Sequence, residues 1–367
     1  MGEKSRQHYV PKFYLRNFSD NDSSIGTFNI AQTRYRQHAS IKDMCQKNNF
    51  YGDDKVVENS LDKHIERPAA RIIKKIIDTD TIPEFEKEFE DYFTLLIFLL
   101  VSEARNLKSA DSANYSFDVL AKMMLKEHPR FKEVDLDRYE IGLKTPANLI
   151  IQNAIKDTRL ILDLEPILIV QNTSRKFITS DNPLVRYNSL YINRNYHGRG
   201  SSLVTRGLQL FLPISSQKCL LFYDSTAYGI PEAKNGIITL TKAREVDWLN
   251  ELFFLNSYDN VFFNQRIKED YIFKKIHNKN RKFPRMKELD REITFFESTR
   301  DNSLLMNMVN NRVEKKIALP WINESKFAKD LILPEHMGGL MRMESPIIRE
   351  YIDMSKKKHQ TYTFRLE

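Results

Sequence analysis

The stretch that decides the fold is Gln7-His8-Tyr9-Val10-Pro11-Lys12-Phe13-Tyr14-Leu15-Arg16-Asn17-Phe18. It combines a titratable histidine, a proline that restricts φ and several aromatic side chains close to the start of the sequence. Chain ends are usually polar and frayed, so we expect a segment this apolar to be packed into the core. A buried His8 then needs a hydrogen-bond partner, whether it transfers protons, binds a metal or anchors the segment.

The composition is that of a globular protein of 367 residues, with 41% hydrophobic and 29% charged residues. Glycine is scarce at 11 residues, and no Walker A, GxGxxG, HExxH or GxSxG motif is present. The two cysteines, Cys45 and Cys219, lie far apart. This spacing indicates neither a disulfide framework nor a zinc knuckle, and we expect a cytoplasmic protein. The longest apolar run, residues 92–101, is about half the length of a membrane span, so no membrane partner is expected.

The helical and strand-like patterns are segregated along the chain. Residues 53–161 are mostly helical, with an apolar stripe at three- and four-residue spacing that Pro68 interrupts. Within residues 162–260, strand-like runs at 165–170, 176–180, 208–213 and 218–223 have hairpin spacing. We therefore predict an α+β fold with a helix-rich N-terminal half, an antiparallel β-sheet region and a C-terminal helix with a basic tail.

We predict a single α+β domain over residues 1–260. The helical part is expected at about 53–161 and the sheet part at about 162–260. Residues 261–367 are expected to form a C-terminal basic extension, packed on this domain or appended to it.

A basic run in this extension suggests a nucleic-acid partner. The formal net charge is +8, which fits RNA or DNA, although many proteins without such a partner are as basic. Residues 274–287 contain no acid, and the interleaved Tyr271, Phe273 and Phe283 could stack on bases. The alternative is a solvated loop. The predicted phosphate-contacting residues are Lys274, Lys275, Lys279, Arg281, Lys282, Arg285 and Lys287.

Four further residues are candidates for chemistry. Asp181 follows a strand-like run and precedes Asn182-Pro183, a position common for catalytic carboxylates and also for ordinary turns. Glu58 and Glu66 are eight residues apart, close to one helical face, where they could bind a divalent metal or remain on the surface. Arg105 ends an apolar helix, so it is either a phosphate clamp or half of an ion pair.

Several of these residues also carry a family resemblance. The chain resembles the bacterial family known as domain of unknown function 4238 over roughly residues 5–260. The segments that carry this resemblance are Gln7–Phe18, Asn49–Tyr51, Glu58 with Glu66, Arg105, Phe177–Pro183, Pro213–Ser215 and Asn250. The resemblance implies no reaction; members resemble standalone accessory proteins, some of them toxin or phage-defence effectors.

Two functional hypotheses follow. The first is a metal-assisted hydrolase of RNA or DNA, in which Asp181 and Glu66, with Glu58, hold Mg²⁺ or Mn²⁺, His8 transfers protons and Arg105 steadies the phosphate. The second is a non-catalytic sensor module that binds nucleic acid or a protein partner from the same defence system. In that case the same polar residues form a buried structural network. The sequence gives no oligomeric state.

Overall fold

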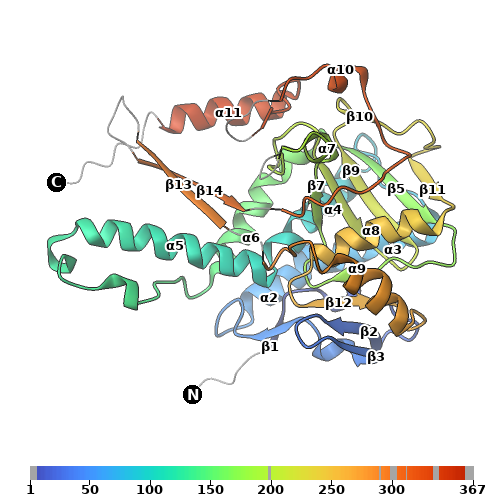
Figure 1. Cartoon of the computed structure of the whole chain (residues 1–367), viewed down its shortest axis with the longest axis horizontal. Helices are drawn as coiled ribbons and strands as arrows, with labels where there is room; N and C mark the ends of the chain where they lie inside the picture. The colour runs from blue at the N-terminus through green and yellow to red at the C-terminus, as the bar shows by residue number, and fades with distance from the viewer. Residues whose placement is uncertain are drawn as a thin grey trace.

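The computed structural model describes residues 6–196, 200–288, 291–297, 304–310, 312–333 and 339–359 (Figure 1). At its centre is a five-stranded sheet in which β11 is parallel to β5 and the other neighbours are antiparallel. Its strands, in spatial order, are β11 (Ile237–Leu240), β5 (Glu165–Gln171), β9 (Lys218–Tyr223), β8 (Gln209–Pro213) and β7 (Val185–Tyr187).

The two faces of this sheet pack against different helices, because side chains of a strand alternate between faces. Leu168, Leu220 and Phe222 belong to the apolar core shared with α3 (Arg67–Thr79) and α4 (Phe89–Ala104). Ile167 and Leu221 belong to the core shared with α8. Figure 1 shows α8 (Ala243–Leu255) in front of the sheet, with α3 and α4 behind it. The α+β prediction is confirmed.

A second sheet holds the N-terminal part of the chain against the first. It is antiparallel throughout. Its spatial order is β3 (Arg34–Ser40), β2 (Ser24–Asn29), β12 (Asn260–Phe263) and β6 (Thr179–Ser180). The opening segment is buried as predicted, since Gln7, Val10, Leu15 and Phe18 are each at most 1% exposed.

The remaining elements are shorter or lie outside the two sheets. Helix α5 (Leu107–Glu127) and the hairpin of β13 (Arg291–Glu297) and β14 (Leu304–Asn310) extend away from the sheets (Figure 1). The other strands are β1 (Arg6–His8), β4 (Gln46–Asn48), β10 (Tyr228–Gly229) and β15 (Asn323–Glu324). The other α-helices are α1 (Lys12–Arg16), α2 (Val56–Leu61), α6 (Pro146–Asp157), α7 (Ser189–Asn193), α9 (Asn278–Asn280), α10 (Lys326–Lys329) and α11 (Pro346–His359). Two π-helical segments are η2 (Asp62–Glu66) and η6 (Tyr271–His277), and 3-10 turns are η1 (Ile41–Asp43), η3 (Pro129–Phe131), η4 (Leu136–Arg138) and η5 (Thr158–Ile161).

One strand expectation is corrected. Of the run at 176–180, only Thr179 and Ser180 form a strand, β6, and it pairs with β12 in the second sheet. The residues before it bond elsewhere, because the Phe177 N–H donates to the Ser216 carbonyl and the Ile178 N–H to the Asn250 side chain. The chain therefore crosses between the two sheets at residues 181–184.

The described part of the C-terminal extension completes the core. Val313, Ile317 and Trp321 are buried in the cluster that includes α8. Arg342 is 2% exposed and binds Asp163 with distances of 2.8 and 3.0 Å. The domain boundary expected at residue 260 falls inside β12. Among the described residues, no helix is long and apolar enough to cross a membrane.

Candidate functional site

Arg105 anchors the N-terminal segment to the helical layer. It follows α4 directly and is 1% exposed. Its Nη1 donates to Glu66 Oε1 at 2.6 Å, its Nε to the Tyr51 hydroxyl at 2.9 Å and its Nη2 to the His8 carbonyl at 2.6 Å. A buried guanidinium is stable only when its donors are satisfied, and here all three nitrogens have acceptors.

His8 and Glu58 lie on the exposed side of this cluster. Glu58 Oε1 accepts the His8 backbone N–H at 3.2 Å and lies 3.9 Å from the imidazole Nδ1. The imidazole Nε2 is 3.1 Å from the Lys42 carbonyl. Burial raises the pKa of Glu58, but the hydrogen bonds and charge of His8 outweigh it, so the pKa is lowered. The structure therefore brings His8, Glu58, Glu66 and Arg105 together.

Asp181 belongs to a different set of contacts. It follows β6, is 1% exposed, and accepts three backbone N–H groups at 2.8 Å each, from Tyr258, Asp259 and Asn260. Burial raises the pKa of Asp181 to about 6, and the three N–H donors partly offset this. Within the described residues, no hydrogen bond or ion pair joins its carboxylate to His8, Glu66 or Arg105. Its geometry is that of a side chain that fixes the α8–β12 turn.

A row of buried asparagines, which sequence reasoning missed, continues from these two clusters. Asn106 Nδ2 donates to Asn182 Oδ1 at 2.6 Å, and Asn182 Nδ2 donates to the Asn256 carbonyl at 2.9 Å. Asn106 also caps α5 by accepting the Ser109 N–H. The sequence offers one indication of these asparagines, since Asn106 directly follows the candidate residue Arg105 and Asn182 directly follows Asp181.

The expected metal ligands Glu58, Glu66 and Asp181 are all engaged in other contacts in this arrangement. Glu66 accepts from Arg105, and both Asp181 oxygens accept backbone N–H groups. The part of the chain that the structure describes contains no group of three or more His, Cys, Asp and Glu side chains arranged to hold a metal ion. Binding of Mg²⁺ or Mn²⁺ stays a prediction of the sequence.

The basic run forms an amphipathic surface segment. Its base is buried through Ile272, Ile276 and Asn280. Its cations face outward, with Arg285 half-buried and six exposed: Lys274, Lys275, Lys279, Arg281, Lys282 and Lys287.

Some of these cations are already paired with carboxylates. The pairs are Lys274–Asp270, Lys279–Glu251, Arg285–Glu288 and Lys287–Asp259. Lys275, Arg281 and Lys282 have no carboxylate within ion-pair distance among the residues described. These three cations are therefore the ones most open to an external anion.

The aromatic side chains of the segment are less available than expected. Tyr271 is 8% exposed, donates to Asp247 at 2.6 Å and lies beneath the Arg175 guanidinium. It does not face solvent, so the prediction that it stacks on bases is wrong. Phe273 packs edge-on against Phe28, and Phe283 is covered by lysine side chains.

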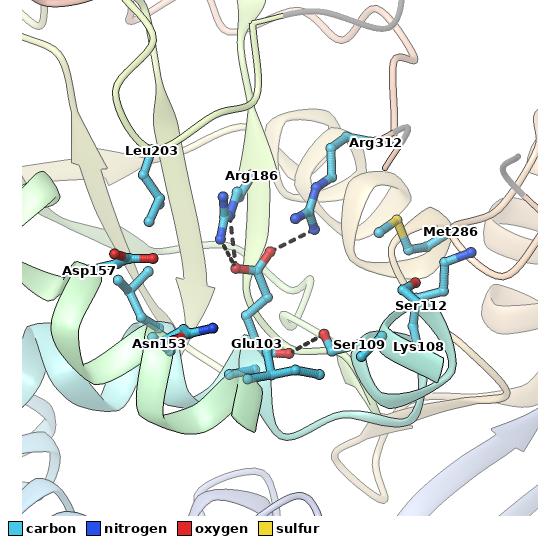
Figure 2. A pocket seen from close by; sticks show the side chains of 15 residues that line it. Glu103, Lys108, Ser109, Ser112, Asn153, Asp157, Arg186, Leu203, Met286 and Arg312 are labelled. Carbon is cyan, nitrogen blue, oxygen red and sulfur yellow. Dashed lines mark hydrogen bonds and ion pairs between the residues drawn. The ribbon is translucent and has the colours of Figure 1, made fainter. Parts of the chain in front are cut away.

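A pocket of about 210 Å³ lies where α4, α5, α6 and β7 meet (Figure 2). At its centre is Glu103, a charged residue that ends the apolar run of α4 and is 5% exposed. Arg186 Nε donates to Glu103 Oε2 at 2.8 Å, and Arg312 Nη1 donates to Oε1 at 2.6 Å. Burial raises the pKa of Glu103, but the two guanidiniums outweigh it and lower the pKa. The three residues are too far apart in sequence for a local motif to predict the cluster.

Fold and site define an α+β protein with closed buried polar clusters, a charged pocket around Glu103 and a basic surface segment at residues 274–287. The chain belongs to the family described as "Protein of unknown function (DUF4238)", whose model matches residues 6–266. The resemblance expected over roughly residues 5–260 is thus confirmed. No curated protein and no solved structure matches the chain.

Proposed function

We propose that the protein is a nucleic-acid-binding module in which residues 274–287 contact phosphate groups and the buried polar clusters hold the fold. The observation that carries the proposal is the outward row of cations on a buried base. Lys275, Arg281 and Lys282 combine exposure with the lack of a carboxylate partner in the described chain. Cations of this kind gain binding free energy from the release of counterions that surround a polyanion.

The closed geometry of the buried clusters supports a structural role for them. Each of the three nitrogens of Arg105 already donates to an acceptor in the protein, and the residue is 1% exposed, which leaves the guanidinium little access to a phosphate. Both oxygens of Asp181 accept backbone N–H groups. These contacts favour the binding module over the hydrolase with His8, Glu66, Arg105 and Asp181 as catalytic residues. A role in bacterial defence rests on the family resemblance alone.

The test is a fluorescence anisotropy titration of the full chain with labelled single- and double-stranded RNA and DNA. The variant is Lys275→Glu/Arg281→Glu/Lys282→Glu. A matched control reverses three cations elsewhere that are also exposed: Lys47, Lys132 and Lys156. Each triple change lowers the formal net charge by six, from +8 to +2. The two variants therefore separate a local contact from the general attraction of a basic protein.

Loss of binding in the segment variant with retention in the control supports the proposal. Equal weakening of nucleic-acid binding in both variants would contradict the proposal, because binding would then depend on the overall net charge and not on residues 274–287. No binding of the wild type to any of the four nucleic acids would also contradict it and direct the search to a protein partner. Metal-dependent cleavage in Mg²⁺ or Mn²⁺ but not in EDTA would favour the hydrolase.

A further inference from the structure

We propose that the pocket around Glu103 binds a phosphomonoester group, with Arg186 and Arg312 as its cationic wall. The proposal stands on the composition of the pocket and does not require that segment 274–287 bind nucleic acid. The pocket is lined by Glu103, Lys108, Ser109, Ser112, Arg186 and Arg312, together with apolar side chains and two polar residues of α6.

The first argument is an imbalance of charge. Two guanidiniums share one carboxylate, and Glu103 is the one carboxylate within ion-pair distance of either among the described residues. The side chains of Arg186 and Arg312 are only 16% and 17% exposed. Uncompensated charge is costly away from water. Burial is also the largest influence on Arg312, whose pKa is lowered despite Glu103. A bound anion would remove this cost.

The second argument is the position of α5. Residues Lys108, Ser109 and Ser112 come from its first turns and line the pocket beside Glu103 (Figure 2). The amino-terminal end of a 21-residue helix favours negative charge. The Ser109 hydroxyl donates to the Glu103 backbone carbonyl at 2.8 Å, which fixes the start of α5 against the end of α4. The amino-terminal end of α5 and the two guanidiniums therefore both favour an anion in this pocket.

The opposite side of the pocket is less cationic. Asn153 and Asp157 of α6 lie there, on the other side of Glu103 from Lys108 (Figure 2). Burial raises the pKa of Asp157, although nearby Arg186 lowers it. These side chains suit the hydroxyl groups of a sugar. The volume of about 210 Å³ suits a phosphate with a small organic group rather than a large cofactor.

Two sources could supply such a group, a free mononucleotide or the phosphorylated end of a strand. Met286 lines the pocket and belongs to residues 274–287, so the pocket lies beside the basic segment. The strand-end source rests on the proposed function, whereas the mononucleotide source does not.

The test is isothermal titration calorimetry of the full chain with inorganic phosphate, adenosine 5′-monophosphate and adenosine. We expect phosphate and the monophosphate to bind and adenosine not to bind. Arg312→Gln should weaken binding of the monophosphate at least about tenfold, since charge-assisted hydrogen bonds are lost. Arg312→Gln also alters the buried cluster, so Asn153→Asp provides a second variant that adds a negative charge at an exposed lining position. It should weaken binding several-fold, whereas Gln152→Glu, its exposed neighbour outside the lining, should change it less.

Absence of heat with both phosphate ligands would overturn the proposal. Binding that survives Arg312→Gln and Asn153→Asp but is lost in Lys275→Glu would overturn it as well, because the anion would then sit on the basic segment. A preference for a 5′-phosphorylated oligonucleotide over its unphosphorylated form identifies the strand end as the source. Equal affinity for both oligonucleotides, with monophosphate binding in the pocket, identifies the free nucleotide.

Discussion

At the scale of single residues, Arg105 shows how a charged side chain can end an apolar helix. It is buried, and its partners are the Glu66 carboxylate, the Tyr51 hydroxyl and the His8 carbonyl. Removing one partner of a buried ion pair leaves the other charge uncompensated. Arg105 therefore holds residues 6–8 in place, although it lies far from them in the sequence.

We predict that Arg105→Met lowers the free energy of unfolding by about 3–5 kcal/mol, because Glu66 would lose its buried donor. Urea denaturation at pH 7 measures this. Arg71→Met is the control, since Arg71 is exposed and its contact with Asp91 is 3.4 Å long; it should cost less than about 1 kcal/mol. Equal losses in the two variants would show that the Arg105 contacts do not anchor the segment.

The raised pKa of Asp181 leads us to predict how the stability of the protein changes with pH. Burial raises its pKa to about 6 in the folded protein, above the ordinary value of 3.8. The folded protein therefore keeps a proton that the unfolded chain has already lost between these two values. The contribution of Asp181 to stability consequently rises as the pH falls through 6 and is complete below about 4.

The Asp181→Asn variant has no titratable side chain at this position. The stability of the wild type relative to the variant should increase by up to about 3 kcal/mol between pH 7 and pH 4. Denaturant titrations of both proteins across this range give the difference and cancel the effects of other titrating groups. A difference that stays constant over the range would mean that Asp181 keeps an ordinary pKa.

At the scale of elements, Gly26 lies where the register between β2 and β3 shifts. A Cβ atom at this position would lie 2.4 Å from the Phe263 ring and 2.9 Å from the Phe263 carbonyl oxygen. We predict that Gly26→Ala destabilises the protein by about 1–3 kcal/mol, because β12 must shift. Gly229→Ala is the matched control, since nothing lies within 4 Å of the point that its Cβ atom would occupy. Thermal unfolding of both variants tests this, and an unchanged melting temperature in Gly26→Ala would contradict the packing of β2 on β12.

Element types were predictable from sequence where the pattern is local. The apolar stripe of α3 follows from helical side-chain periodicity, and β5 and β9 are recognisable as short continuous apolar runs. Strand partners were not predictable, because pairing is decided by backbone groups far away in the chain. Thr179 and Ser180 pair with β12, about eighty residues later, although the nearest strand in sequence is β7.

The same reasoning separates the parts of the site. The exposure of Lys275 and Lys282 could be predicted from the sequence, because residues 274–287 contain no acidic residue. The cluster of His8, Glu58, Glu66 and Arg105 was suggested by residue type, but its closed geometry depends on main-chain acceptors such as the His8 carbonyl. The Glu103 pocket was missed, because Arg186 and Arg312 approach it from distant elements.

At the scale of the whole molecule, the family match ends before the core does. The match covers residues 6–266, whereas Val313, Trp321 and Ile348 are buried further along the chain. A chain ending at residue 266 should therefore expose apolar surface and lose its cooperative thermal transition. Differential scanning calorimetry of this shortened chain beside the full chain measures the effect. A cooperative transition at the full-length melting temperature would show that the extension is dispensable for the fold.

The most direct test of the proposed function is the salt dependence of nucleic-acid binding by the wild type and by Lys275→Glu/Arg281→Glu/Lys282→Glu. Each phosphate contact contributes roughly 0.7–0.9 to the slope of log affinity against log salt concentration. We predict that the segment variant loses roughly two to three units of slope, while the Lys47, Lys132 and Lys156 charge-reversal control retains the wild-type slope. Identical slopes in the wild type and the segment variant would contradict binding through residues 274–287.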